Sequence, residues 1–170
     1  MEKTLQEEVA EEIIIELKKD PSVIGIEIAG SLARGEIRSD SDVDFGVTST
    51  TAEKDKLVSK TLKGIKVDIW INPVSVLKKV IEEYPYLFGL PSMYIIVYDP
   101  KNILSEAYEI MQDYYQNHPE VAQFWEKELD LHRLRRQAGI KSKNFYRVLD
   151  EAEIRFSNKK KVTRDFYIDD

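Results

Sequence analysis

The alternation of apolar and polar residues divides the chain into a strand-rich first part and a helical second part. In residues 42–48 and 65–72, apolar side chains occupy every second position, which is the period of a β-strand. In residues 4–19 they recur at every fourth position, as in an amphipathic helix, and Thr4 with Glu7 predicts a capping box. The whole pattern predicts strands at 23–29, 42–48, 65–72 and 93–99, and helices at 4–19, 73–84, 102–116, 119–138 and 141–157.

This order of elements predicts an α+β protein. We expect a small mixed β-sheet with helices on one face, followed by a C-terminal helical region. The change of pattern after Asp99 and Pro100 divides the chain into a sheet domain at 1–100 and a helical region at 101–170. Asn72 and Pro73 predict the cap and the first turn of the helix at 73–84.

The alternation directs three aspartates to one side of the predicted sheet. Asp42 and Asp44 lie two positions apart on one strand, opposite its apolar residues, and Asp68 lies opposite the apolar side of another strand. If these strands are neighbours, three carboxylates converge on one polar face. Carboxylates this close repel one another unless they are solvated or share a cation such as Mg²⁺. The pattern therefore predicts either a metal site or a solvated acidic face.

A glycine turn precedes the acidic strand. Gly30 and Ser31 end the strand at 23–29, and a small residue there lets a phosphate approach backbone N–H groups and the serine hydroxyl. Arg34 follows and can add a charge-assisted contact. Ten residues separate Ser31 from Asp42, enough for the chain to loop back and place the acids beside the turn. Asp40 lies between serines, outside the alternation, and we interpret it as a turn or capping residue.

Composition indicates a globular protein with a substantial core. The chain has 170 residues, of which 42% are hydrophobic and 10% aromatic, and it has no cysteine, which excludes disulfides and thiolate metal sites. The acidic N-terminus does not have the layout of a signal peptide, and no apolar run has the length of a membrane span. We therefore expect a cytoplasmic protein that does not associate with membranes.

Charge is distributed unevenly along the chain. The net charge of −6 comes from the first 100 residues, because residues 101–170 are neutral, whereas residues 133–164 carry 11 basic and 3 acidic side chains. This basic segment is either a solvated helix surface or a wall that faces a triphosphate or a polyanionic acceptor. The acidic total does not favour a nucleic-acid partner.

Three further residues have ambiguous patterns. Trp70 shares the parity of Asp68, so it either lines a pocket and stacks on a base or only covers the sheet. His118 and His132 are too far apart to indicate a metal site, and we expect surface positions for both.

The joint spacing of these motifs resembles that of a known superfamily. A Gly-Ser pair followed after ten residues by "DVD", with a third acid in "KVDIWI", resembles the nucleotidyltransferase superfamily typified by DNA polymerase β, over about residues 20–100. It is most similar to the minimal nucleotidyltransferase branch and more distantly to kanamycin nucleotidyltransferase. The resemblance implies that Asp42, Asp44 and Asp68 are catalytic and metal-binding, and that Gly30 and Ser31 hold the β- and γ-phosphates.

The resemblance also implies a reaction. A nucleoside monophosphate, in the first instance AMP from ATP, would be transferred to a hydroxyl on a small molecule, a protein or an RNA end. Two Mg²⁺ ions would assist, with Mn²⁺ as a substitute, and Asp68 would bind the second ion or activate the acceptor. The alternatives are an antitoxin-type module that engages a partner protein and a pseudoenzyme that senses nucleotide.

Overall fold

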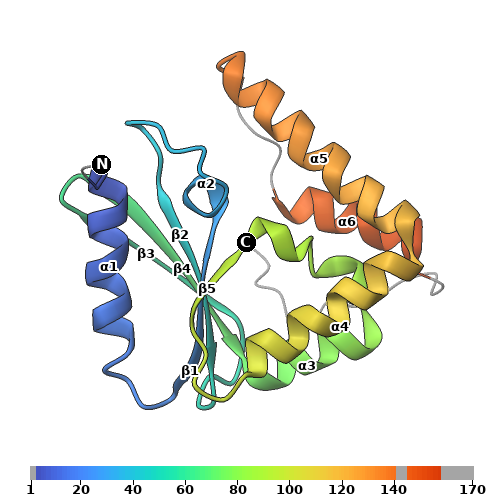
Figure 1. Cartoon of the computed structure of the whole chain (residues 1–170), viewed down its shortest axis with the longest axis horizontal. Coiled ribbons are helices and arrows are strands. Elements are labelled where there is room, and N and C mark those ends of the chain that lie inside the picture. The colour runs from blue at the N-terminus through green and yellow to red at the C-terminus, as the bar shows by residue number, and fades with distance from the viewer. Residues whose placement is uncertain (1–2, 141–144, 158–170) are drawn as a thin grey trace.

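The structure is a computed structural model that describes residues 3–140 and 145–157. Figure 1 shows a β-sheet with a single helix on one side and the remaining long helices on the other side. The elements are α1 (Leu5–Leu17), β1 (Val23–Ala29), α2 (Gly30–Ala33), β2 (Val43–Ser49), β3 (Lys56–Leu62), β4 (Ile65–Pro73), α3 (Val74–Glu83), the short 3-10 turns η1 (Pro85–Leu87) and η2 (Pro91–Met93), β5 (Ile95–Tyr98), α4 (Ile103–Asn117), α5 (Pro119–Gln137) and α6 (Phe145–Phe156).

The five strands form one mixed sheet in the order β3-β4-β2-β1-β5. The β2–β4 pair is parallel, and the other three pairs are antiparallel. The turn between β3 and β4 consists of Lys63 and Gly64, whose φ angles of 52° and 81° are typical of a tight hairpin. The α+β class with a mixed sheet and a C-terminal helical region is therefore confirmed.

The apolar face of the sheet packs under α1. The predicted capping box is present, because Thr4 accepts a hydrogen bond from the backbone of Glu7 and the Glu7 side chain accepts one from Thr4. Val9 and Ile13 of α1 are fully buried against residues of β1, β2 and β4. The sheet residues that line this core are Val23, Ile26, Ile28, Val43, Phe45, Val47, Ile65, Val67 and Ile69.

A second apolar core lies among the helices. Trp125 of α5 is 2% exposed, and its indole N–H donates a hydrogen bond of 2.9 Å to the carbonyl oxygen of Tyr86. Val80 of α3 and Leu149 of α6 belong to the same core. Because α3 and η1 pack with the helices that follow β5, residues before position 100 contribute to this second core. The division of the chain at residue 100 stays a prediction.

The opposite face of the sheet is contacted at one end by α3 and α4. Leu104 of α4 lies against Gly25 and Thr48, where an added Cβ on Gly25 would come within 2.9 Å of the leucine side chain. We predicted helices on one face of the sheet, and the structure has helices on both faces. The rest of this face is left for the pocket described below.

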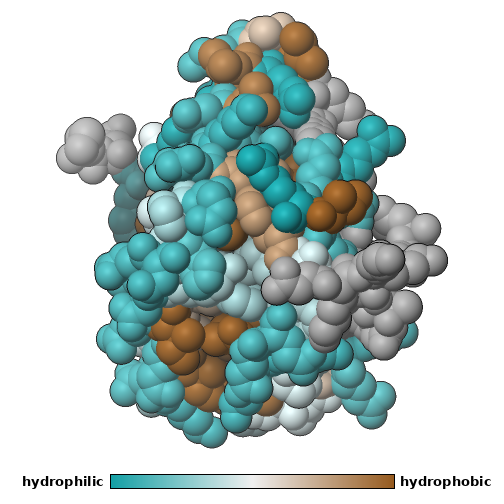
Figure 2. All heavy atoms as spheres, turned by 90° about the vertical axis from the view of Figure 1, so that its right-hand side faces the viewer, coloured by the Kyte–Doolittle hydropathy of each residue, from teal (hydrophilic) through white to brown (hydrophobic). Residues whose placement is uncertain are grey.

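The outer side of the helical region is mostly hydrophilic. Figure 2 shows this side, with small hydrophobic areas separated by polar residues. Among the described helices, Ile110, Leu134 and Ile154 are exposed apolar residues. No helix within the described ranges is both long enough and apolar enough to cross a membrane.

Two local predictions were wrong or incomplete. Strand β3 was not predicted, because Lys56–Leu62 lacks a strong apolar alternation and is largely exposed on an edge of the sheet. Asn72 does not cap α3, because it still pairs with Thr48 inside the sheet and Pro73 occupies the cap position. The predicted helix at 141–157 corresponds to α6, and residues 141–144 lie outside the described residues.

Candidate active site

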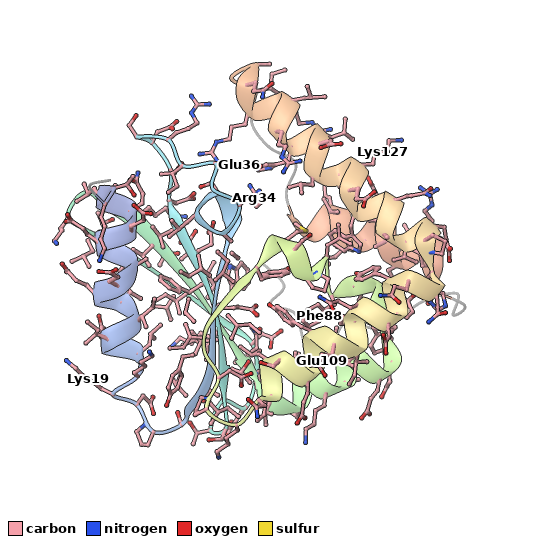
Figure 3. All side chains as sticks on the ribbon, in the orientation of Figure 1. Lys19, Arg34, Glu36, Phe88, Glu109 and Lys127 are labelled. Atoms are coloured by element: carbon pink, nitrogen blue, oxygen red, sulfur yellow. The ribbon has the colours of Figure 1, made fainter. Side chains whose placement is uncertain are left out.

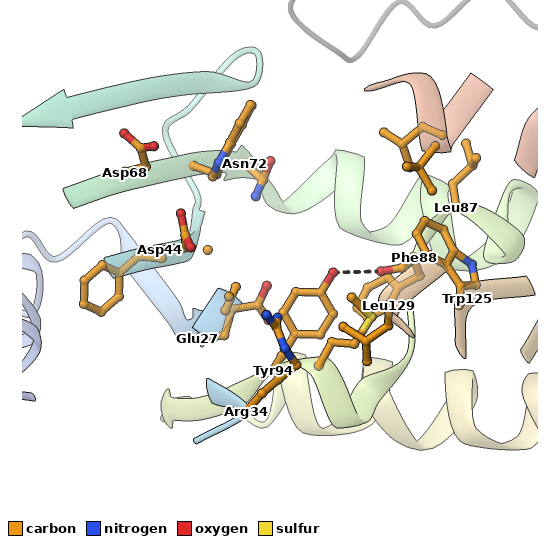
Figure 4. Close-up of a pocket in the computed structure, with 18 of the residues that line it drawn as sticks. Glu27, Arg34, Asp44, Asp68, Asn72, Leu87, Phe88, Tyr94, Trp125 and Leu129 are labelled. Carbon is orange, nitrogen blue, oxygen red and sulfur yellow. Dashed lines mark hydrogen bonds between the residues drawn. The ribbon is translucent and has the colours of Figure 1, made fainter. Parts of the chain in front are cut away.

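The three aspartates singled out by alternation lie together. Asp44 of β2 and Asp68 of β4 are directly paired in the parallel register, and Asp42 immediately precedes β2. One carboxylate oxygen from each residue lies within 4.8 Å of the other two. Figure 4 shows Asp44 and Asp68 on neighbouring strands at one end of the pocket. We call Asp42, Asp44 and Asp68 the acidic triad.

The triad concentrates negative charge in a partly buried place. Burial and, after it, the negative charges of Asp42 and Asp68 raise the pKa of Asp44 to about 6. Asp68 accepts a hydrogen bond of 2.6 Å from the Ser59 hydroxyl and forms an ion pair with Lys66. Since Lys66 is the single ammonium paired with the triad among the described residues, the carboxylates retain a net negative charge that favours a cation.

The glycine turn lies directly against the triad. Gly30 has a φ of +67°, and a Cβ added there would be 2.1 Å from Oδ2 of Asp44, so any larger residue would displace that carboxylate. Ser31 is 2% exposed, and its Oγ has no hydrogen-bond partner in the part of the chain that the structure describes. The turn therefore brings backbone and an unpartnered hydroxyl beside the carboxylates.

The loop after the turn is held by α5. Arg34, whose side chain is 8% exposed, donates a hydrogen bond of 2.9 Å to Glu36, and Arg133 of α5 donates one of 2.6 Å to the same carboxylate. Arg136 donates a hydrogen bond of 2.7 Å to the Ser41 hydroxyl, next to the triad in sequence. Figure 3 shows Arg34 and Glu36 between α2 and α5.

Part of the basic segment therefore faces the site. Arg34, His132, Arg135 and Arg136 all line the pocket, whereas Arg147 is exposed on α6 and does not. Burial, together with the positive charges of Arg34 and Arg136, lowers the pKa of His132. His132 is half-buried and lines the pocket, and α5 contacts the loop before Asp42 through Arg133 and Arg136. Lys141 and Lys143 lie outside the described residues.

The pocket continues from the triad along the sheet to the helical region. It has a volume of about 690 Å³, which lies within the usual range for small-molecule sites. Trp70 is among the lining residues, whereas its stacking on a base stays a prediction. The far end is apolar, with Leu87, Phe88, Trp125 and Leu129 opposite the carboxylates (Figure 4). One pocket thus joins a charged end to an apolar end.

Three acidic residues of the pocket were not found from the sequence, namely Glu27, Asp55 and Glu128. Glu27 of β1 lies opposite Gly46, where any Cβ would be 2.4 Å from its carboxylate, and it accepts a hydrogen bond from Tyr108. Desolvation raises the pKa of Glu27 to about 7. Its alternation with the isoleucines of β1 was a usable signal. Asp55 had no such signal, because it precedes the strand that was not predicted.

The donor set suits a magnesium-bound polyphosphate. Three carboxylates supply only oxygen ligands, which Mg²⁺ prefers, and Mg²⁺ sites commonly combine one or two carboxylates with phosphate oxygens. The unpartnered Ser31 hydroxyl provides a hydrogen-bond donor for such a phosphate. Asp40 is outside this set, because it is exposed and pairs with Arg38 at 3.3 Å.

Comparisons with known proteins place the chain in a family. The model of the nucleotidyltransferase domain family matches residues 10–132. Among solved structures, the chain is similar to a nucleotidyltransferase-like protein from Exiguobacterium sibiricum, with 12% identity and a TM-score of 0.47 over 86% of this chain. The matched region spans about half, 53%, of that protein. The search of curated proteins found no match.

The family match covers more than half of the chain and includes the glycine turn, the acidic triad and most of α5. The chain therefore belongs to the nucleotidyltransferase domain family.

Proposed function

We propose that the protein transfers a nucleoside monophosphate, in the first instance AMP from ATP, to a hydroxyl group of an acceptor. The observation that carries this proposal is the convergence of three carboxylates, a glycine turn and an unpartnered serine hydroxyl in one pocket. A solvated acidic face would explain the carboxylates alone. It would not explain a buried hydroxyl without a partner beside them.

The residues of the chain have distinct tasks in this proposal. The Ser31 hydroxyl and the backbone at Gly30 hold the terminal phosphates, and Arg34 and Arg136, which line the same pocket, balance their charge. Asp42, Asp44 and Asp68 would hold Mg²⁺. When bound, Mg²⁺ would supply electrostatic stabilisation of the charge that develops on the transferred phosphoryl group and on pyrophosphate.

The transfer step conserves atoms and charge in a simple way. The acceptor oxygen forms a bond to the α-phosphorus while the bond from that phosphorus to the bridging oxygen of pyrophosphate breaks. The hydroxyl proton passes to a triad carboxylate, and Asp68 is the residue that the family resemblance implies. Asp68 is held in position for this by Ser59 and Lys66. Pyrophosphate leaves past the glycine turn.

The test is a search for a labelled acceptor. ATP labelled at the α-phosphate is incubated with Mg²⁺, the protein and a fractionated cell lysate, and the label is followed into small molecules, proteins and RNA separately. We expect one labelled fraction with the wild-type protein and none with Asp42→Asn or Asp68→Asn. If both variants labelled the acceptor as strongly as the wild-type protein does, the assignment of the triad would be refuted.

A second outcome separates catalysis from binding. If ATP binds in the presence of Mg²⁺ but no fraction becomes labelled, the protein is a nucleotide-binding module, and a stoichiometric protein partner becomes the next target. Circular dichroism of both variants controls for folding. The lysate must also be tested without added protein, since other enzymes in it use the same nucleotide.

A further inference from the structure

Asp55 is a buried acidic residue of the pocket that lies outside the triad. It is 3% exposed, lines the pocket and directly precedes β3. Neither of its carboxylate oxygens has a hydrogen-bond partner among the described residues. By contrast, Glu27 and Asp68 in the same pocket each accept a hydrogen bond. Asp55 therefore stands apart from the other acids whose partners are known.

The register of the sheet locates Asp55 relative to the triad. Lys56 pairs with Ile71 at the end of the β3–β4 ladder, so Asp55 and Asn72 are the next residues of their segments beyond that pair; Asn72 in turn pairs with Thr48 of β2. Asn72 lies four residues beyond Asp68 on β4, a distance of about 13 Å at roughly 3.3 Å per residue. Trp70 lies between them on the same face. Asn72 and Asp68 mark the two ends of this row in Figure 4.

A purely structural role explains Asp55 poorly. A buried carboxylate without a hydrogen bond destabilises a fold, and acids retained in such places usually have a partner. Burial alone raises the pKa of Asp55 to about 7, with no contribution from a nearby charge. The missing partner is therefore expected to come from outside the chain.

We propose that Asp55 and Asn72 form a subsite for a protonated amine on the acceptor. This inference rests on the proposed function and specifies its substrate class: an amino alcohol whose hydroxyl reaches the triad while its ammonium group reaches Asp55. A metal ion does not fit here, because one carboxylate and one amide provide too few ligands. An anion does not fit either, because the carboxylate would repel it.

The contact requires a small movement of one side chain. Both oxygens of Asp55 are covered, so the carboxylate turns toward the pocket by rotation about its two side-chain bonds when the amine enters. Trp70 offers an aromatic surface to the chain between the hydroxyl and the amine, and also to the cation itself. The subsite therefore recognises the positive charge of the ammonium group and the apolar chain that joins this group to the hydroxyl.

The closing experiment measures binding without nucleotide, so that it does not depend on catalysis. The probes are 6-aminohexan-1-ol and hexane-1,6-diol, which differ in one terminal group, and dissociation constants are measured by ligand-observed NMR at pH 8. We expect the amino alcohol to bind the wild-type protein at least about fivefold more tightly, as for a hydrogen-bonded charge pair. Asp55→Asn should abolish that preference, and Asp40→Asn should preserve it.

Further readouts keep the proposal testable if one variant is poorly folded. Asn72→Ala should reduce the preference about threefold, and Asp55→Asn should melt at the same temperature as the wild type or higher. Equal binding of both probes to the wild type, or a preference retained in Asp55→Asn, would overturn the subsite. If the wild-type protein prefers the amino alcohol but labels no acceptor, only the catalytic proposal is contradicted. If it labels an acceptor but shows no preference for the amino alcohol, only the subsite is contradicted.

Discussion

The pocket has two acidic regions, the triad and Asp55, which differ in how their charges are partnered. At the triad, one oxygen from each of three carboxylates lies within 4.8 Å of the others, Lys66 and Ser59 contact Asp68, and Arg34 is nearby. In the second region, Asp55 is a single buried acid without a described hydrogen-bond partner. A cluster of this kind suits a small ion of high charge, whereas a single carboxylate suits a single positive charge.

This difference explains how one sheet face can separate two ligands. Both regions use side chains that point away from the apolar core under α1, so they belong to the same wall of the pocket. The distance of about 13 Å along β4 is several times a hydrogen-bond or metal–ligand distance, so one cation cannot contact both groups at once. The predictions below test each region against the other.

The largest effect should come from neutralising a triad residue. Asp44→Asn removes a carboxylate that touches both the glycine turn and the two other acids, so we expect the transfer rate to fall by at least about 100-fold. The measurement is pyrophosphate release with saturating Mg²⁺ and ATP. Asp40→Asn is the matched control, because Asp40 is exposed and paired with Arg38, and its rate should match the wild type.

The second prediction isolates the close approach at the glycine turn. Gly30 and Gly35 both have a φ of +67°, but an added Cβ meets Asp44 at 2.1 Å in the first case and nothing within 4 Å in the second. Gly35→Ala should lower the free energy of unfolding by only about 1 kcal/mol, the cost of the backbone conformation. Gly30→Ala should cost about 2 kcal/mol more, since steric crowding adds to that penalty.

Urea denaturation measures both glycine variants, and ATP affinity separates stability from function. Gly30→Ala should also lose measurable ATP binding, whereas Gly35→Ala should keep it within a factor of about two. If the two variants were equally stable, the triad would not pack against the turn as described.

The third prediction concerns pH and the isolated acid. The pKa of Asp55 is raised from 3.8 to about 7, so the folded state binds a proton more tightly than the unfolded state between these values. Stability contributed by this group is therefore complete below pH 3.8 and is lost as the pH rises toward 7. At pH 8 Asp55→Asn should be more stable than the wild type by on the order of 2 kcal/mol.

The measurement is urea denaturation of both proteins at pH 4, 6 and 8. The difference between wild type and Asp55→Asn should be smallest at pH 4 and should stop growing above pH 7. A difference that does not vary with pH would mean that Asp55 is already ionised in the folded protein near its ordinary pKa.

The smallest effect should come from the contact between α5 and the loop at the triad end. Arg133 donates to Glu36, which also holds Arg34, but the Arg133 side chain is 42% exposed. A double-mutant cycle with Arg133→Gln and Glu36→Gln should give a coupling of about 0.5 kcal/mol, as is typical of an exposed ion pair. Glu36→Gln alone should weaken ATP binding a few-fold, because Arg34 loses the ion pair that holds its side chain in place. An unchanged ATP affinity would mean that Arg34 does not contribute to nucleotide binding.

Much of the triad end was predictable because its information is local. Alternation along β2 and β4 assigns Asp42, Asp44 and Asp68 to the polar side, since successive side chains of a strand point to opposite faces. The same reasoning applied to β1 would have identified Glu27. The Gly30 turn was also readable, because glycine is the residue that accepts a positive φ at no steric cost.

The rest of the pocket depended on contacts between distant segments. The pairing of β3 with β4 brings Asp55 to the pocket. This pairing was not predictable, because β3 has a weak alternation of apolar residues and an exposed position at the edge of the sheet. His132, Arg135 and Arg136 reached the pocket because α5 crosses above the loop of residues 34–42. Such packing is decided by tertiary contacts, which local patterns do not encode.

The amino-acid sequence by itself determined which side chains share a face, where the first helix begins and which turn needs a glycine. These properties follow from backbone geometry over a few residues. Only the tertiary structure decided that Asp44 and Asp68 are register partners, that α5 contacts the loop before Asp42, and that Asp55 is buried without a described hydrogen-bond partner. Those features arise from segments far apart in the chain, whose relative positions are set by the burial of two separate apolar cores.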